Sequence, residues 1–146
     1  MLRIAIWILV AAASFSAAAA QEEPPSRFNL TVVVQGVDSA KGVVGLVLFS
    51  TPNGWPEDVA DSFRHMAVPS QPGTSTMVVS DLPAGRYAIA VIHDLNENMR
   101  LDKNWLGKPK EQWGMSNNPH AMLRAPSFQD AEFDLMRNEQ ITIRLQ

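Results

Sequence analysis

A period-two alternation of apolar and polar residues constrains the fold of this chain most strongly. Every second residue is apolar at 28–35 and again at 141–146, which is typical of strands that bury one face. Residues 43–49 are almost entirely apolar, as in a central strand. Further strands are expected at 64–68, 74–79, 87–91 and 131–136. Since only one short helical turn is expected, at 57–63, the pattern predicts an all-β, antiparallel sandwich of about seven strands.

The only tyrosine of the chain supports a Greek-key arrangement of these strands. Gly85 lies two residues before Tyr87, at the entrance to a predicted strand. This spacing is typical of a tyrosine corner, in which the phenol bonds to backbone a few residues upstream. The alternative is a plain turn followed by a core tyrosine. We favour the corner because Tyr87 leads the alternation that continues at Ile89 and Val91.

The first twenty residues have the order of a secretory signal. Arg3 is their only charge, residues 4–10 are apolar, and small residues end in Ala18-Ala19-Ala20. The alternative is an uncleaved membrane anchor, but the second half of the segment is mostly alanine and serine. We therefore expect a signal peptide at 1–20, a disordered leader at 21–27 and one domain at 28–146, with no membrane span after cleavage.

Composition excludes several classes of protein. The formal net charge is −3, so no basic excess indicates a nucleic-acid partner. The absence of cysteine excludes disulfides, thiolate zinc sites, iron–sulfur clusters and a thiol nucleophile. An exported protein without cysteine fits the periplasm of a Gram-negative bacterium better than a eukaryotic extracellular space.

The segment 94–127 is too long for an ordinary hairpin. Connections of this length inside a compact domain are usually functional. Trp105 and Trp113 suggest that the segment is an ordered loop, packed against itself or against the sandwich. If these rings are exposed instead, they would form a binding surface.

Side-chain oxygens recur at alternate positions at the start of this loop, as they do in calcium-binding loops. Asp94, Asn96 and Asn98 would bind Ca²⁺ through their side chains, Arg100 through its carbonyl, and Asp102 directly or through water. We therefore predict a calcium site formed by these residues and Glu111. The alternative is an Asx-rich turn whose side chains satisfy the backbone of the loop.

Two positions depart from the usual calcium loop. Met99 stands at the sixth position, where glycine normally makes the sharp turn. Trp105 stands at the twelfth, where a bidentate glutamate is usual. Glu111 or Asp130 would have to supply that ligand.

The chain resembles a bacterial secreted family, domain of unknown function 2141 (DUF2141). Leu82-Pro83-Ala84-Gly85-Arg86-Tyr87-Ala88 corresponds to its run L-P-x-G-x-Y-A, and His93-Asp94 to Asp102 corresponds to H-D-x-N-x-N-G-x-x-D, with Met99 at the glycine. Two further runs match Leu106-Gly107-Lys108-Pro109-Lys110-Glu111 and Gly114-Met115-Ser116-Asn117-Asn118. The resemblance spans about residues 28–146. It implies a transthyretin-like or carboxypeptidase-regulatory-like β-sandwich and export, and it implies no reaction.

Other chemistry remains open. A hydrolase or metal-dependent enzyme would use His93 and Asp94, with Ser116 or Ser127 as nucleophile, but no nucleophile motif surrounds either serine. A metal site of the three histidines (His65, His93 and His120) lacks paired spacing. A carbohydrate- or peptide-binding module would use Trp55, Trp105 or Trp113 for stacking. We favour a periplasmic, non-enzymatic sandwich that binds or supports a cell-envelope protein or glycan, without a cofactor other than the predicted Ca²⁺.

Overall fold

The computed structural model describes residues 26–120 and 124–146. The expected signal peptide at 1–20 lies outside the described residues, as does most of the expected leader at 21–27. Arg27, the last residue assigned to that leader, already belongs to the first strand. The first strand therefore begins one residue before the predicted domain boundary at 28.

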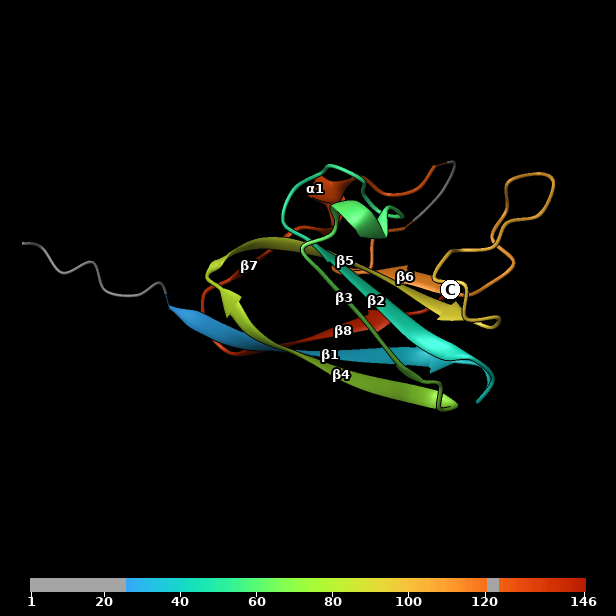
Figure 1. Ribbon diagram of the computed structural model, residues 1–146, viewed down its shortest axis with the longest axis horizontal. Coiled ribbons are helices and arrows are strands. Elements are labelled where there is room, and N and C mark those ends of the chain that lie inside the picture. Colours follow the sequence, from blue (N-terminus) through green and yellow to red (C-terminus); the bar gives the residue numbers. More distant parts are fainter. Residues whose placement is uncertain (1–25, 121–123) are drawn as a thin grey trace, which may run out of the picture.

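Two β-sheets pack face to face (Figure 1). The first sheet has the order β4 (Gly73–Pro83), β1 (Arg27–Val37), β8 (Glu139–Arg144). The second has the order β3 (Arg64–Pro69), β2 (Val43–Phe49), β5 (Gly85–Asp94), β6 (Trp113–Met115), and β7 (Phe133–Leu135) also pairs with β5. The all-β sandwich is thus confirmed, with eight strands in the described residues where about seven were expected.

The helical elements of the described residues are short. They are the 3-10 turn η1 (Val59–Asp61) and the helix α1 (Phe128–Ala131). Neither is long and apolar enough to cross a membrane.

One strand pairing differs from the antiparallel prediction. β8 runs parallel to β1, whereas the other paired strands are antiparallel. The preceding strand, β7, pairs with β5 in the second sheet. The chain therefore crosses between the sheets after β7 and enters the first sheet in the direction of β1.

The strand predicted at 131–136 needs correction, and the ordered loop predicted at 94–127 contains a strand and a helix start that the sequence did not indicate. Residues 128–131 form α1, which starts with a capping box between Ser127 and Asp130. Only 133–135 continue as β7, and Phe128 and Ala131 of α1 are buried against side chains of the second sheet. β6 lies inside the predicted loop, at Trp113–Met115.

β5 is buried on both faces, because two apolar clusters use the second sheet. The main cluster lies between the sheets and includes Tyr87, Ile89 and Val91, in the predicted alternation. The second cluster covers the outer face of the second sheet and consists of Phe49, Ala88, Met115, Phe128 and Ala131. The Trp55 ring packs edge-on between Phe49 and Phe128.

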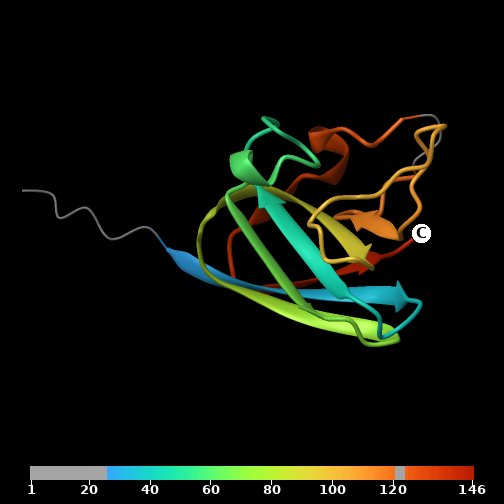
Figure 2. The ribbon, with the colours of Figure 1, turned by 45° about the vertical axis from the view of Figure 1, so that its right-hand side comes forward.

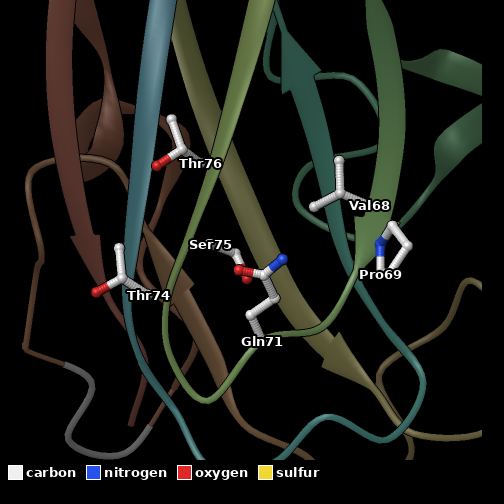
Figure 3. A pocket seen from close by; sticks show the side chains of 6 residues that line it. All are labelled: Val68, Pro69, Gln71, Thr74, Ser75 and Thr76. Atoms are coloured by element: carbon white, nitrogen blue, oxygen red, sulfur yellow. The ribbon is translucent and has the colours of Figure 1, made fainter.

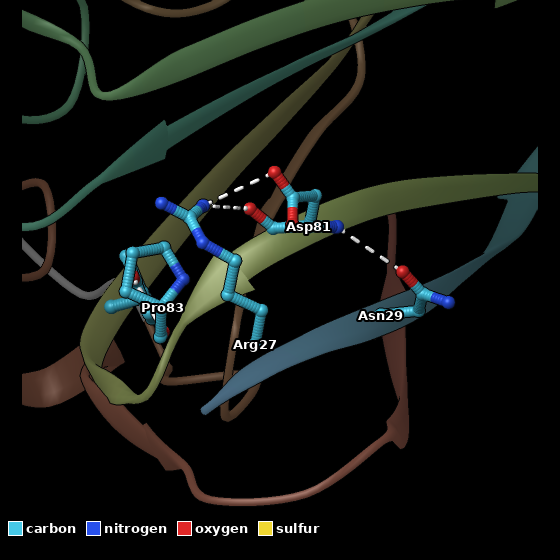
Figure 4. A network of polar contacts seen from close by, with 5 residues as sticks. Arg27, Asn29, Asp81 and Pro83 are labelled. Carbon is cyan, nitrogen blue, oxygen red and sulfur yellow. Dashed lines mark hydrogen bonds and ion pairs between the residues drawn. The ribbon is translucent and has the colours of Figure 1, made fainter. Parts of the chain in front are cut away.

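The predicted tyrosine corner is confirmed. The Tyr87 hydroxyl donates to the carbonyl oxygen of Pro83, four residues upstream, at 2.9 Å. Nearby, the Arg27 guanidinium donates to the Asp81 carbonyl and carboxylate at 2.9 and 3.1 Å, and Asn29 Oδ1 accepts from Asp81 N–H (Figure 4). These bonds join the start of β1 to the end of β4 beside the corner.

Candidate functional site

The predicted calcium-loop residues lie in a loop at 94–112, here called the braced loop, that follows β5. Asp94, the last residue of β5, is fully buried. Its two carboxylate oxygens accept hydrogen bonds from the backbone N–H groups of Asn98 (3.2 Å) and Met99 (2.7 Å). Gly42 lies against the Asp94 carbonyl so closely that a Cβ atom would be 2.1 Å from that oxygen. The Asp94 carboxylate therefore holds the first turn of the loop, while its backbone packs against the connection between β1 and β2.

The next oxygens of the loop bond to one another and to backbone. Asn96 and Asn98 each donate a side-chain N–H to a carboxylate oxygen of Asp102, at 2.8 and 3.1 Å. Their carbonyl oxygens accept from the backbone N–H groups two residues further along. These are Asx turns, the arrangement weighed as the alternative to a calcium loop.

Glu111 closes the braced loop from its far end. This side chain is buried, and its two oxygens accept from the backbone N–H groups of Leu95 (2.8 Å) and Asp102 (3.0 Å). One carboxylate therefore fastens the end of the loop to its beginning. The sequence singled out Glu111 as a replacement ligand, and the structure does bring it to the Asp94–Asp102 segment.

The N–H groups of the loop already occupy the side-chain oxygens of the predicted calcium ligands. Every carboxylate oxygen of Asp94, Asp102 and Glu111 already accepts an N–H group of the loop, so Ca²⁺ would have to compete with those donors. Arg100 is exposed. Within the described residues, no three His, Asp or Glu side chains are grouped to hold a metal. Met99 adopts a left-handed backbone (φ +59°), which explains why a glycine suits this position.

Asp130 does not belong to this loop. Its carboxylate accepts from the backbone N–H and the hydroxyl of Ser127 at the start of α1. These hydrogen bonds hold the pKa of Asp130 below its ordinary value. Glu111 is therefore the acidic side chain that reaches the braced loop, of the two considered for the twelfth position.

The middle of the braced loop is a small hairpin at 103–109, here called the tip hairpin, closed by a bridge between Lys103 and Pro109. Asn104 holds it together, because its side-chain oxygen accepts from the N–H groups of Leu106 and Lys108, at 2.9 and 3.0 Å. The Asn104 backbone also bonds to Gly107 and Lys108. In Figures 1 and 2 this yellow-orange segment extends away from both sheets.

The tip hairpin carries the most exposed large apolar side chain of the described residues. Trp105 is 90% exposed and its neighbour Leu106 is 60% exposed. Trp55 and Trp113 are only partly exposed and pack on the second cluster, and Trp55 donates its indole N–H to the Pro126 carbonyl. The expectation that tryptophan packs the loop therefore holds for Trp113 and is wrong for Trp105.

The residues considered for catalysis are held by hydrogen bonds to backbone groups and, for His93, also to the Gln112 side chain. The buried Ser116 hydroxyl donates to the Ala131 carbonyl and accepts from the Ile89 N–H. His93 is buried, and its ring nitrogens lie 2.9 Å from the Lys41 carbonyl and 3.1 Å from Gln112 Oε1. Ser127 caps α1. His65 and His120 are exposed on separate elements, and the structure does not bring the three histidines together.

The Gly114-to-Asn118 motif fastens β6 to its neighbours, a role that the sequence did not reveal. Asn117 donates to the Glu132 carbonyl before β7. Asn118 donates to Thr142 and accepts from the Arg144 N–H, both in β8. A Cβ atom on Gly114 would lie 2.7 Å from the Arg144 carbonyl, so only glycine allows this approach of β6 to β8.

A pocket of about 300 Å³ lies between the end of β3 and the start of β4 (Figure 3). The Ser75 hydroxyl in its wall is buried and lacks a hydrogen-bond partner among the described residues. None of the predicted metal ligands lines the pocket. Its lining residues are Val68, Pro69, Gln71, Thr74, Ser75 and Thr76.

Comparison with known proteins places the chain in a family. No similar protein was found among the curated proteins or among the solved structures. Residues 32–144 match the family described as "Uncharacterized protein conserved in bacteria (DUF2141)". The match covers every strand of the sandwich, the first only in part, together with the whole braced loop. The chain therefore belongs to the DUF2141 family.

Proposed function

We propose that this protein is an exported, non-enzymatic binding module of the bacterial cell envelope, and that the tip hairpin is its contact element. The observation that carries the proposal is the 90% exposure of Trp105 on a hairpin braced from within. Exposed large apolar side chains that are held rigidly are typical of binding surfaces.

The bonding of the braced loop supports this role. Asp94, Asp102 and Glu111 direct their carboxylates at loop N–H groups, so they order the loop. Ordering a long loop costs conformational entropy. In this protein the ordered loop nevertheless holds an apolar tip in water. Preorganisation of a contact element lowers the entropy lost on binding. His93 and Ser116 serve the same scaffold, which favours binding over catalysis.

Envelope fractions test the proposal. The full chain is expressed in a Gram-negative host, and the mass of the recovered protein shows whether residues 1–20 were removed. The protein is then pelleted with isolated envelope fragments. We expect a processed periplasmic protein that binds the fragments, and a Trp105→Ser/Leu106→Ser variant that binds at least about fivefold less. Retention of the leader in a cytoplasmic protein, or equal binding by both proteins, contradicts the proposal.

A calcium-ordered loop is the second candidate, because Asn96 and Asn98 contact the Asp102 carboxylate and Glu111 bonds to the Asp102 N–H in the same loop. Calcium sites of exported modules are weak, with Kd of about 10⁻⁴–10⁻³ M. Thermal unfolding is measured with Ca²⁺ and with a chelator. The Asp94→Asn/Asp102→Asn variant is the control, since it should lose any calcium response. A melting temperature that Ca²⁺ leaves unchanged in the wild type contradicts the calcium site.

A further inference from the structure

We infer that the tip hairpin docks on an anionic phospholipid bilayer, with Trp105 and Leu106 entering the interface between lipid headgroups and acyl chains. This inference rests on the proposed function and names its partner. The argument uses the shape of the hairpin, the chemistry of its tip and the charges beside it.

The shape suits a planar surface. The tip hairpin extends away from both sheets (Figures 1 and 2), so its end can reach a bilayer before the rest of the domain does. The Asn104 side chain accepts two N–H groups inside the hairpin, so these backbone donors need no water when the tip enters a less polar medium.

The chemistry of the tip is that of an interfacial anchor. Tryptophan is enriched at membrane interfaces because its large apolar ring carries one polar N–H. Trp105 is accompanied by the exposed Leu106, so the two adjacent side chains offer a continuous apolar surface. No other pair of adjacent residues among the described ones exposes two large apolar side chains in this way.

Lysine side chains follow Trp105 and Leu106 in the sequence. Lys108 and Lys110 are exposed and take part in none of the ion pairs found among the described residues. Lys103 pairs with Glu57. Residues 103–110 contain three lysines and no acidic residue, although the whole chain carries a net charge of −3. Long lysine side chains beside an apolar anchor can reach anionic headgroups, which favours an acidic bilayer over a neutral one.

Vesicle binding tests the inference, with Trp105 as the natural reporter. Purified protein is titrated with vesicles of phosphatidylcholine, with and without phosphatidylglycerol. The chain has four tryptophans, and Trp7 lies in the expected signal peptide, so the protein is used after residues 1–20 have been removed. Of the other three, Trp105 is nearly fully exposed, whereas Trp55 and Trp113 are partly buried, so a blue shift of the emission reports entry of Trp105 into lipid. We expect this shift only with phosphatidylglycerol vesicles, and we expect added salt to weaken binding.

Matched variants assign the binding to the tip. Trp105→Ser/Leu106→Ser should abolish binding, and Lys108→Gln/Lys110→Gln should weaken it by about tenfold or more. The control is Met136→Ser/Arg137→Gln, which removes an exposed apolar side chain and a cation from the β7–β8 turn, far from the tip hairpin in Figure 1. It should bind as the wild type does. All preparations must share one N-terminus, so that the apolar leader does not contribute differently.

The outcomes separate the inference from the proposed function. Equal binding to neutral and anionic vesicles, or equal binding by the tip variant, overturns the inference. If the envelope fragments bind in a tip-dependent manner but no vesicle does, lipid docking is overturned and a protein or glycan partner takes its place. If neither binds, the proposed function fails as well.

Discussion

At the scale of single residues, polar side chains of the family motifs act mainly on backbone groups. Asp94 and Glu111 accept loop N–H groups, and Ser116 and Asn118 bond to strands on either side of β6. A long loop has few backbone partners of its own, so side chains must satisfy its N–H and C=O groups. Motif residues that look catalytic in sequence can therefore be structural.

The tyrosine corner predicts a pH-dependent contribution to stability. Tyr87→Phe removes the bond to Pro83 and should lower the free energy of unfolding by about 1 kcal/mol near neutral pH. Burial raises the pKa of Tyr87, so the fold favours the neutral phenol. The contribution is therefore full below the ordinary tyrosine pKa of about 10 and is lost as pH rises through the raised pKa.

Urea unfolding of both proteins across this range checks the sign. The difference between wild type and Tyr87→Phe should shrink and then reverse in alkali, because only the wild type has a phenol to ionise. A constant difference at all pH values would contradict the corner as the source of the effect.

Alanine substitutions at two glycines distinguish the cost of steric overlap from the cost of backbone strain. Gly42 and Gly73 both have positive φ, +72° and +90°, but only at Gly42 would a Cβ atom meet backbone, at Asp94 and Leu95. Gly73→Ala should therefore cost about 1 kcal/mol through its conformation alone. Gly42→Ala should cost about 3 kcal/mol or more, because the loop base must also shift. Equal losses in thermal unfolding would show that the close approach is unimportant.

At the scale of elements, Glu111 closes the braced loop, which Asp94 and Asp102 also help to order. Glu111 accepts hydrogen bonds from the N–H groups of Leu95 and Asp102 and so joins the end of the loop to its first half. The sequence indicates Glu111 as a calcium ligand and as part of a family motif, but spacing cannot reveal that two backbone donors converge on it.

Replacement of Glu111 should loosen this element selectively. In Glu111→Gln one of the two acceptor oxygens becomes an amide N–H₂ that faces a backbone N–H, at a cost of about 1–3 kcal/mol. We expect faster amide hydrogen exchange at Leu95 and Asp102, with little change in β1. The exposed Glu97→Gln is the control in the same loop. Unchanged exchange at both amides would contradict the closing role of Glu111.

At the scale of the molecule, the second sheet joins two apolar clusters into one unit. β5 supplies Ile89 to the core between the sheets and Ala88 to the cluster on the outer face. The C-terminus links the sheets further, because Gln146 and Trp113 exchange backbone hydrogen bonds. We therefore expect both clusters to unfold together.

Truncations in the two clusters test this cooperativity. Ile143→Ala in the main core should cost about 2–5 kcal/mol and Phe128→Ala in the outer cluster about 3–5 kcal/mol. Each variant should still show one thermal transition that coincides in circular dichroism and tryptophan fluorescence. Separate transitions in Phe128→Ala would mean that the outer cluster is an independent unit.

The sequence by itself determined most of the strands and the tyrosine corner, because both depend on local patterns. A period of two requires one buried face, and glycine before tyrosine sets the corner geometry within a few residues. The same reasoning located the braced loop and named the side chains that order it. The prediction of a strand at 131–136 was partly wrong, because a helix of one turn is too short to show a helical periodicity in the sequence.

Only the tertiary structure decided what each strand face and each loop side chain packs against. The parallel pairing of β8 with β1 depends on where the chain crosses between sheets, and the outer cluster depends on Trp55 and Phe128 arriving from distant segments. The same holds for the two loop tryptophans, since Trp113 packs beside that cluster, whereas Trp105 is left 90% exposed by the residues that the structure describes. Burial and bonding partners are properties of surfaces brought together by folding, and local spacing does not contain them.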